Sequence, residues 1–577
     1  MILNGWSRRL AVFATVGLLV TACSGTATTA PGTATPAAST PATPAPSASG
    51  SAAASPSAAG STIPRGGTLS IAYKSDYQHL DPAVQYDTVG IGGTRLMFEA
   101  PLTYDSGTKL EPMLATAMPT ISSDGLTYTF TLRSGVNFVN EDGSILREMT
   151  ADDFVYSINR VLDPNLKPAP SPVSTAFFGN IAGAAEVISG KAKTATGLKA
   201  LNAHDVEIDL VKADATFLNI LATTFASVVP KELATEDTAA FDAKPVGTGP
   251  YVLSAYTKGQ QATFTANKHY WMPDQPYLDE IDVRIGVDDN AALQQVEAGT
   301  LDLLGDPIPS GSFTQVTTDP QYADQIVHHT LVSTSYLSMD TSQPNNGPLS
   351  KLAVRQAISM AIDKDAILQI LHGAGTKATC ILPPDMPGYD PTCEGPKFDQ
   401  AAAKTALAAA GYPDGFETTL YADTTDPDPA IAQSIQADLA TIGVKAKVVT
   451  QEFGTLLGTM ESPHKAPMVW IGWFEDYPDP SDFIDPILSC ATAVNGAANA
   501  AYYCNKTVDA QAAAARGEVD PVKRLAEYQA VQKLIMADAP WVPAFYQDLY
   551  EMKSKRVGGF AIHPVWLYTL RDVWINP

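Results

Sequence analysis

The sequence predicts an α/β fold with at least two lobes. The chain has 577 residues, and the part after residue 62 is far longer than the roughly 250–300 residues at which one hydrophobic core stops growing. Hydrophobic residues at 45% and aromatic residues at 8% supply enough apolar material for several cores, which excludes a largely disordered chain. Strand-like and helix-like patterns alternate after residue 63, as is typical of α/β lobes with mixed sheets.

The charge balance restricts the partners. Asp and Glu number 61 against 37 Lys and Arg, which gives a formal net charge of -24. Nucleic acids are polyanions that proteins bind with Lys and Arg, so the field of this chain repels them. The same sign argues against docking on anionic lipid by surface charge.

The N-terminus has the pattern of a signal peptide over residues 1–22. Arg8 and Arg9 precede an apolar run at 10–20, and small residues lead to Cys23. Eleven helical residues span about 16 Å, roughly half of the ~30 Å hydrocarbon layer, so this run is too short for a membrane span. The residues before Cys23 resemble a bacterial lipobox, which predicts a lipidated Cys23 and an anchor on the outer face of the cell membrane. The alternative, an ordinary cleavage site, would release the protein.

Residues 23–62 form the predicted tether. After Cys23 they are almost entirely Ala, Ser, Thr, Pro and Gly, with no charge and no large apolar side chain. Such a segment cannot bury a core, so we expect a disordered leash between the lipid and the folded body.

The first predicted elements of the folded body are strands. Leu69, Ile71 and Tyr73 alternate with small or polar residues, and the turn Asp124-Gly125 precedes a second alternating run at 126–132. Further strands are predicted at 329–339, 444–449 and 468–473.

Helices follow from spacing and capping. Thr150 with Asp153 has the spacing of a capping box and predicts a helix that starts near residue 151. Apolar residues at helical spacing predict a helix over 349–362, and Asp363 can cap another that runs to about Leu371. Two later helices are expected at 429–442, before Gly443, and at about 521–537.

Four cysteines besides Cys23 lie in what we expect to be an oxidising compartment: Cys380, Cys393, Cys490 and Cys504. They allow three pairings, and we favour Cys380 with Cys393 and Cys490 with Cys504 because each closes a short loop. A four-cysteine zinc site is the rival interpretation, but no C-x-x-C spacing occurs.

Eight short motifs occur in one order, and together they resemble the bacterial extracellular solute-binding proteins of family 5, the peptide- and nickel-binding receptors of ABC importers. The matching stretches are 66–69 (GGTL), 124–133 (DGLTYTFTLR), 150–157 (TADDFVYS), 245–251 (PVGTGPY), 267–271 (NKHYW), 354–357 (VRQA), 473–480 (WFEDYPDP) and 539–543 (APWVP).

The resemblance implies a two-lobed clamp of the periplasmic-binding-protein type, in the type II, large peptide-binding subclass, with mixed sheets. Lobe I takes residues 63–328 and carries an extra subdomain at about 100–244. Lobe II takes 329–539, and 540–577 return to lobe I. We expect the chain to cross between lobes near 329–340 and 540–546, and a bound ligand to hold the clamp shut by binding the closed form better.

The resemblance also implies the ligand site. An acidic residue after the tryptophan binds the α-ammonium of a peptide, and this position falls on Asp476. Trp473, Phe474 and Tyr477 flank it and are predicted to contact the ligand. From the residues alone, the acids and prolines around Asp476 favour a solvated turn cluster or a loose calcium loop over a ligand site. Gly247, Thr248 and Gly249 could approach the ligand, although a purely structural turn is the favoured interpretation.

The predicted function is capture of peptides and their delivery to the permease subunits of an ABC transporter, by a monomer with no cofactor and no resident metal. No G-x-S-x-G, H-E-x-x-H or P-loop motif occurs, so no catalytic residue is assigned. His328 and His329 point to opposite faces of a strand, which favours a structural role. The alternatives are another solute on the same clamp, such as a nickel complex, an opine or an oligosaccharide, and a lipid-anchored secreted hydrolase. A peptide is the favoured ligand because a ligand without a cationic end would leave Asp476 unpaired.

Overall fold

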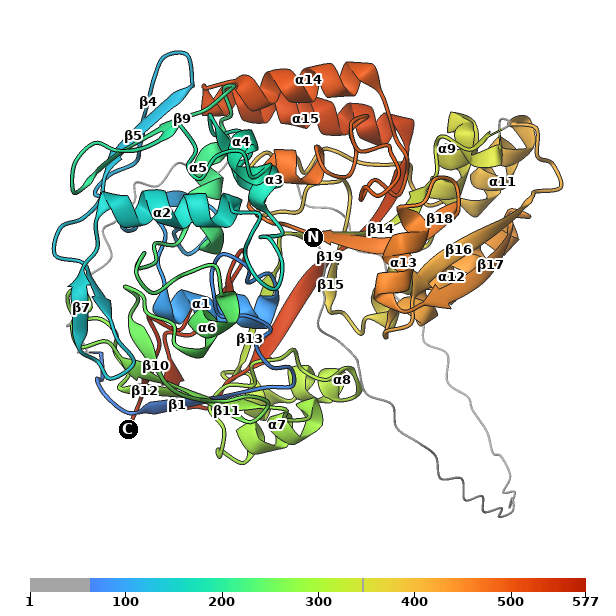
Figure 1. Cartoon of the computed structure of the whole chain (residues 1–577). Coiled ribbons are helices and arrows are strands. Elements are labelled where there is room, and N and C mark those ends of the chain that lie inside the picture. The colour runs from blue at the N-terminus through green and yellow to red at the C-terminus, as the bar shows by residue number, and fades with distance from the viewer. Residues whose placement is uncertain (1–62, 345–346) are drawn as a thin grey trace, which may run out of the picture. The chain divides into compact units, whose positions relative to one another are not determined.

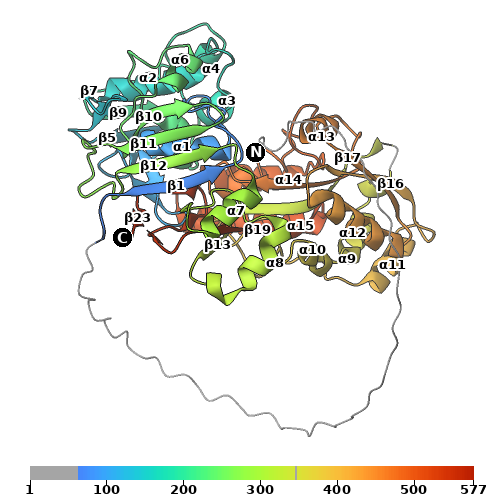
Figure 2. The same cartoon turned by 90° about the horizontal axis from the view of Figure 1, so that it is seen from below.

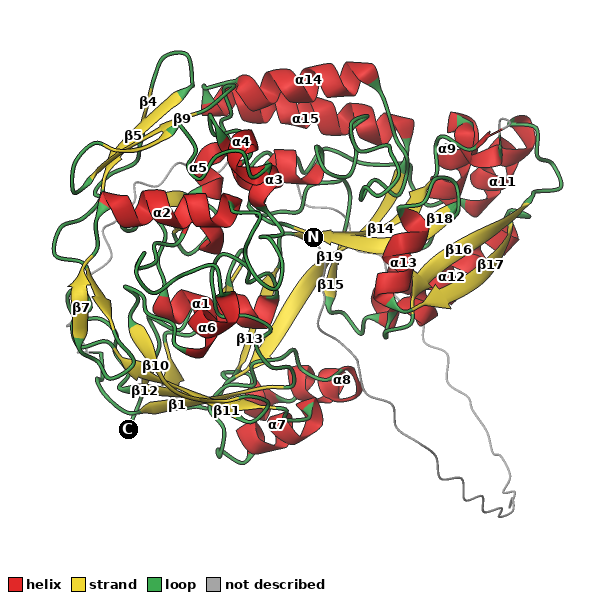
Figure 3. Cartoon of the chain, viewed as in Figure 1, coloured by secondary structure: helices red, strands yellow, loops and turns green. Residues whose placement is uncertain are grey.

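A computed structural model describes residues 63–344 and 347–577 (Figure 1). The predicted signal peptide (1–22), the lipidated Cys23 and the tether to residue 62 lie outside the described residues. Helices and strands are mixed throughout, and both large sheets contain parallel and antiparallel pairs (Figure 3). The predicted α/β class with mixed sheets is confirmed.

The first large sheet has four strands in the order β1-β12-β11-β10. Its strands are β1 (Thr68–Tyr73), β12 (Glu280–Ile285), β11 (Gln261–Ala266) and β10 (Tyr251–Thr257). β1 runs parallel to β12, and the other neighbours are antiparallel. The predicted strand at the start of the folded body is therefore β1, which pairs with a strand about 200 residues later in the sequence.

The second large sheet has seven strands. Its path is β13 (Ile326–Thr330), β19 (Trp541–Met552), β14 (Ser333–Met339), β18 (Met468–Phe474), β16 (Glu417–Asp423) and β17 (Lys445–Gln451), and β15 (Gly375–Lys377) also pairs with β19. β19 is the long red strand of Figure 1, with β13 along one part of its length and β14 along the other. One strand near the C-terminus thus ties together both halves of this sheet.

Smaller sheets complete the strands. β4 (Thr120–Ile121), β5 (Thr127–Thr131), β9 (Asp205–Asp209) and β8 (Leu198–Ala200) form a four-stranded sheet. The two-stranded sheets pair β2 (Leu102–Tyr104) with β3 (Leu110–Pro112), β6 (Asn137–Val139) with β7 (Ile145–Glu148), β20 (Val557–Gly558) with β23 (Trp574–Ile575), and β21 (Ile562–His563) with β22 (Leu567–Tyr568).

The helices of the first part of the chain are α1 (Thr88–Met97), α2 (Ala151–Leu162), α3 (Ser174–Phe178), α4 (Ala184–Ile188), α5 (Phe217–Ile220), α6 (Thr238–Ala243), α7 (Asp289–Glu297) and α8 (Ser310–Thr318). The start of α2 shows why helices begin where the sequence predicts. The Asp153 carboxylate accepts a hydrogen bond from the Thr150 backbone N–H at 2.9 Å, which satisfies a donor that has no partner within the helix.

The later helices are α9 (Leu352–Ala361), α10 (Lys364–Ile370), α11 (Gln400–Ala409), α12 (Asp428–Thr441), α13 (Phe453–Met460), α14 (Lys506–Gly517) and α15 (Pro521–Asp538). Asp363 caps α10 as predicted, because its carboxylate accepts from the N–H groups of Asp365 and Ala366. Figure 2 shows α9, α10, α11 and α12 gathered beside the β16 end of the second sheet.

Two element predictions needed correction. The strand predicted over 329–339 is two strands, because β13 ends at Thr330, β14 begins at Ser333, and the two flank opposite edges of β19. The helix predicted from residue 349 begins at Leu352, after a short 3₁₀ turn at Pro348–Ser350.

Both disulfides favoured from loop length are present in the structure. Cys380 is joined to Cys393, and Cys490 is joined to Cys504. The first lies in an apolar cluster with Tyr336 and Trp541, so it closes a loop against the second sheet. The four cysteines therefore do not form the rival zinc site.

A buried ion pair holds the segment before α1 against α2. The Arg160 guanidinium donates two hydrogen bonds to the Asp81 carboxylate, at 2.7 and 2.5 Å, and both side chains are at most 3% exposed. Removing one partner leaves an uncompensated buried charge.

Arg160→Met is expected to lower the free energy of unfolding by about 3–5 kcal/mol, the usual cost of breaking a buried pair. Chemical denaturation followed by circular dichroism measures this. Lys109→Met is the control, since its pair with Glu111 is largely exposed and contributes little. Equal stabilities of the two variants would contradict the argument.

Candidate ligand-binding site

The residues predicted to bind ligand lie where β18 ends and an acidic segment follows. We call residues 475–485 the acidic segment; it contains Glu475, Asp476, Asp479, Asp482 and Asp485. β18 is an inner strand of the second sheet, paired with β14 and β16, so the start of this segment is fixed by two neighbouring strands. A site placed here is carried by rigid structure.

Asp482 folds the acidic segment back on the end of β18. Its Oδ2 accepts a hydrogen bond from the Trp473 indole N–H at 3.1 Å and another from the Asp476 backbone N–H at 3.0 Å. Asp482 is 2% exposed, and burial raises the pKa of its carboxyl well above the usual range. These two bonds fix the backbone at the position that carries the Asp476 side chain.

Asp479 and Asp485 have arginine partners. Both side chains of the Asp479–Arg524 pair are under 10% exposed, and their closest N–O distances are 2.7 Å. Arg516 on α14 forms ion pairs with Asp485 at 2.5 Å and with Asp214 at 2.8 Å. These pairs connect the acidic segment to the loop before α5. These acids therefore bind separate cations instead of converging on a shared one, unlike a calcium loop.

Asp476 meets a residue from the first part of the chain. The Tyr86 hydroxyl donates a hydrogen bond to Asp476 Oδ1 at 2.9 Å, across 390 positions of sequence. Burial raises the pKa of the Tyr86 phenol, and the Asp476 charge raises it further. The Tyr86 ring packs edge-on against Phe225 at 5.4 Å, which fixes the direction of its hydroxyl. The Asp476 carboxylate is thereby held in a defined orientation at the junction of the two parts.

The three predicted aromatic residues pack against three different apolar clusters. Trp473 contacts the cluster around Tyr336 and Trp541, whereas Phe474 contacts the cluster beneath the first sheet. Tyr477 is 8% exposed and meets Phe177 edge-on at 5.8 Å. Each of the three rings therefore packs against a hydrophobic core, and the three cores differ.

A cationic group lies near the acidic segment. Arg95, in the last turn of α1, stacks on the Trp566 ring at 4.1 Å and forms no hydrogen bond with any described residue. Burial lowers its pKa to about 9. The indole N–H of Trp566 is also buried without a partner in the described chain. Tyr104 contacts Trp566 at 5.4 Å, and its pKa responds to Arg95 as well as to Glu475 and Asp482. Unpaired donors of this kind suit an anionic group.

Gly247 and Gly249 serve packing. A Cβ on Gly247 would lie 2.0 Å from the Met97 carbonyl oxygen, and one on Gly249 would lie 2.5 Å from that of Leu96. The glycines let this turn approach the end of α1, which carries Arg95. The structure thus supports the structural interpretation of the two glycines.

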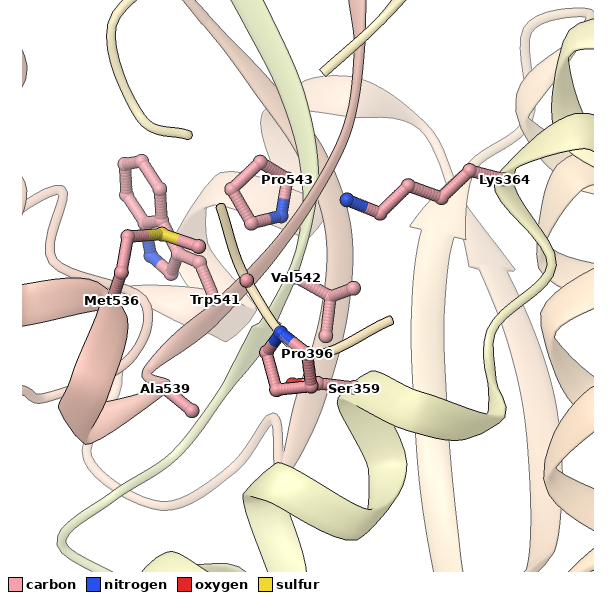
Figure 4. Close-up of a pocket in the computed structure, with 9 residues that line it drawn as sticks. Ser359, Lys364, Pro396, Met536, Ala539, Trp541, Val542 and Pro543 are labelled. Carbon is pink, nitrogen blue, oxygen red and sulfur yellow. The ribbon is translucent and has the colours of Figure 1, made fainter. Parts of the chain in front are cut away.

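A separate small pocket lies among α9, α10, α15 and β19 (Figure 4). The Lys364 side chain extends toward Pro543, and its ammonium donates to the Ala378 carbonyl at 2.9 Å. Burial lowers the Lys364 pKa to about 8. None of the predicted site residues lines this pocket.

His328 and His329 have structural contacts. His328 lies against the Tyr550 ring, and His329 Nε2 is 2.6 Å from an Asp385 oxygen. Across residues 63–344 and 347–577, no group of three or more His, Cys, Asp or Glu side chains is arranged to hold a metal ion. Within the same described ranges, no helix is long and apolar enough to cross a membrane.

Comparison with known proteins assigns the family. Residues 109–495 match bacterial extracellular solute-binding proteins, family 5. Di/tripeptide-binding protein 1 of Pseudomonas aeruginosa is 31% identical over 82% of this chain and 87% of its own length. The chain belongs to this solute-binding family.

Other members are similar over comparable lengths. Heme-binding protein A of Haemophilus influenzae is 32% identical over 79% of this chain and 82% of its own. The solved structure of the periplasmic binding protein DppA from Helicobacter pylori, in complex with the peptide STSA, matches with a TM-score of 0.73 at 27% identity and covers 89% of this chain and 99% of that one. The fold is that of the periplasmic binding proteins, and the family consists of extracellular receptors that bind solutes.

Sequence reasoning missed Tyr86 and Arg95. Neither belongs to a motif that carries the resemblance to family 5. One sequence feature could have drawn attention to Arg95, because it is the only charged residue in α1 (TVGIGGTRLM). Tyr86 had none, since its pairing with Asp476 exists only in three dimensions.

His563 gives the loop that carries Trp566 a pH dependence. Its Nδ1 accepts from the N–H groups of Val565 and Trp566 at 3.1 Å, and Nε2 lies 2.6 Å from the Asp105 carbonyl, so Nε2 is the donor. Burial lowers the His563 pKa from 6.5 to about 4. The unfolded chain therefore binds more protons than the folded one between these pH values.

The contribution of His563 to stability is expected to be full above about pH 6.5 and to fall by about 2–3 kcal/mol as the pH drops toward 4. Denaturant unfolding at pH 7 and pH 4.5 measures the difference, which His563→Gln should reduce. The exposed His269, changed to Gln, serves as the control. The same pH slope in His563→Gln and the unmodified protein would show that His563 does not cause it.

Proposed function

We propose that this chain captures peptides between two lobes and delivers them to the permease subunits of an ABC transporter, without performing bond chemistry. The observation that carries the proposal is the Asp476 carboxylate, oriented by Tyr86 and by the backbone bond to Asp482. A fixed carboxylate at this junction suits the α-ammonium of a peptide. The peptide-binding names of several relatives support the same ligand class.

The proposed lobes are residues 63–328 with 540–577, and 329–539, with the extra subdomain at about 100–244. Contacts between them involve Tyr86 with Asp476, Phe177 with Tyr477, and Asp214 with Arg516. We propose that these contacts form when the clamp closes around ligand, which would stabilise the closed form.

Arg95 is proposed to bind the carboxylate end of the ligand. Its guanidinium has no hydrogen-bond acceptor in the described chain, while the Trp566 ring holds its plane. An acidic anchor at one end and a cationic one at the other match the zwitterionic form of a short peptide. Trp473, Phe474 and Tyr477 are proposed to support the walls of the site around Asp476.

The proposed location is the outer face of the cell membrane. Cleavage after residue 22 and lipidation of Cys23 would anchor the chain. Residues 24–62 would act as a flexible linker between the lipid and the monomeric folded body. The family of extracellular receptors is consistent with export.

Asp476→Ala is expected to weaken peptide binding by about 3–5 kcal/mol, because the ligand ammonium loses its buried partner. Isothermal calorimetry measures this with peptides first identified by mass spectrometry of material released from the purified protein. Asp414→Ala, at an exposed carboxylate, is the control. Unchanged affinity would remove Asp476 from the site. Release of only a metal complex, an opine or an oligosaccharide, or cleavage of added peptide, would overturn the proposed function.

Arg95→Met should abolish the preference for a peptide with a free C-terminal carboxylate over its C-terminal amide. In the unmodified protein the free acid is expected to bind about tenfold or more tightly, as for a charge-assisted pair. Arg133→Met is a matched control, because Arg133 also stacks on a tryptophan but donates to the Met113 carbonyl. A preference that survives in Arg95→Met would contradict the assignment.

A further inference from the structure

Glu475 is a buried carboxyl group without a partner. It is 9% exposed, and neither carboxylate oxygen forms a hydrogen bond with any described residue. Two other acids of the same segment, Asp479 and Asp485, each have an arginine. Buried polar groups in folded proteins are almost always hydrogen-bonded, so an acid that has neither an ion-pair partner nor a hydrogen-bond donor among the described residues requires an explanation.

Glu475 directly precedes Asp476 and continues the extended chain of β18. Its backbone N–H donates to the Val332 carbonyl at 3.2 Å, so the strand geometry of β18 continues through this residue. Side chains alternate along a strand, which places Glu475 on the same side as Trp473, whose indole contacts Asp482. The Glu475 charge also contributes to the raised pKa of Tyr104. The carboxyl therefore lies near enough to Asp482 and Asp476 for their charges to raise its pKa.

Among the described residues, the charged groups that act on Glu475 are acidic. Burial raises the pKa of its carboxyl most, and the charges of Asp482 and Asp476 raise it further. Arg95 and Tyr104 both contact the Trp566 ring. Burial favours the protonated form of the Glu475 carboxyl. A cationic group placed here would offset the repulsion among the three neighbouring carboxylates. It would also donate hydrogen bonds to the two Glu475 oxygens.

We propose that Glu475 binds a second cationic group of the ligand, so that the site selects peptides with a lysine or arginine side chain on their first or second residue. This proposal rests on the proposed function and deepens it. Asp476 would take the α-ammonium, and the adjacent Glu475 would take the basic side chain. A resident metal ion is not the partner we infer, because the described acids form no group arranged to hold one.

The proposal has a thermodynamic consequence. Pairing with a cation favours the ionised form of Glu475, so binding of a basic peptide should release more protons than binding of a neutral peptide. Affinity for the basic peptide should therefore rise with pH over the range in which Glu475 titrates. A purely structural carboxyl would show no such difference between the two ligands.

The test compares peptides that carry lysine at position one or two with peptides that carry norleucine at the same place. Calorimetry at pH 7.5, in two buffers of different ionisation enthalpy, gives affinity and proton release for the unmodified protein, Glu475→Gln and the control Glu417→Gln, which changes an exposed acid. We expect at least one lysine peptide to bind about tenfold or more tightly than its norleucine counterpart, which is typical of a paired buried charge. Glu475→Gln should lose that preference and the additional proton release, whereas Glu417→Gln should keep both.

Each outcome decides the proposal. No preference for lysine, or a preference retained by Glu475→Gln, overturns it while leaving the proposed function intact, since neutral peptides still bind. If Glu475→Gln loses all peptides, circular dichroism separates misfolding from function, and a folded variant with that loss overturns the side-chain role. If Glu475→Gln misfolds, the test depends on the unmodified protein. The proposal then stands only if that protein prefers the lysine peptide and releases more protons on binding it. Failure of every peptide to bind the unmodified protein overturns the proposed function and this inference together.

Discussion

The candidate site depends on the two hydrogen bonds that the Asp482 carboxylate accepts. By receiving the Trp473 indole N–H and the Asp476 backbone N–H, Asp482 turns the chain immediately after an inner strand of the second sheet. This turn places the Asp476 carboxylate where it accepts a hydrogen bond from the Tyr86 hydroxyl. Because the carboxylate is buried, these bonds are shielded from water and define the backbone more firmly than exposed ones would.

The acidic segment separates structural charges from those we propose for binding. Asp479 and Asp485 are neutralised by Arg524 and Arg516, which come from the two neighbouring helices α15 and α14. Glu475 and Arg95 have opposite charges, and neither has a hydrogen-bond partner in the described chain. Asp479 and Asp485 pair with arginines, whereas Glu475, a few residues away, does not. The charged groups without such partners make the surface chemically specific. Such a surface suits a zwitterionic ligand better than an uncharged one.

Much of the fold could be predicted from local patterns. The alternation at 68–73, the capping box at Thr150 and the cap at Asp363 depend on neighbours within a few residues, so the sequence carries them directly. The strand predicted at 329–339 was too long because its division depends on β19, more than 200 residues later. Asp476 could be placed because it lies in a motif, whereas Tyr86 and Arg95 lie outside the motifs.

The sequence by itself determined the class of fold and the family to which the motifs point, and it predicted the acidic residue that we propose binds the ligand ammonium. It did so because periodicity, capping and short motifs are local properties. The tertiary structure alone decided which acids are paired, which aromatic rings are packed, and which charged groups lack partners. Those properties arise from contacts between residues hundreds of positions apart, such as Tyr86 with Asp476 and Arg95 with Trp566. Burial, which sets their energetic weight, exists only in the folded chain.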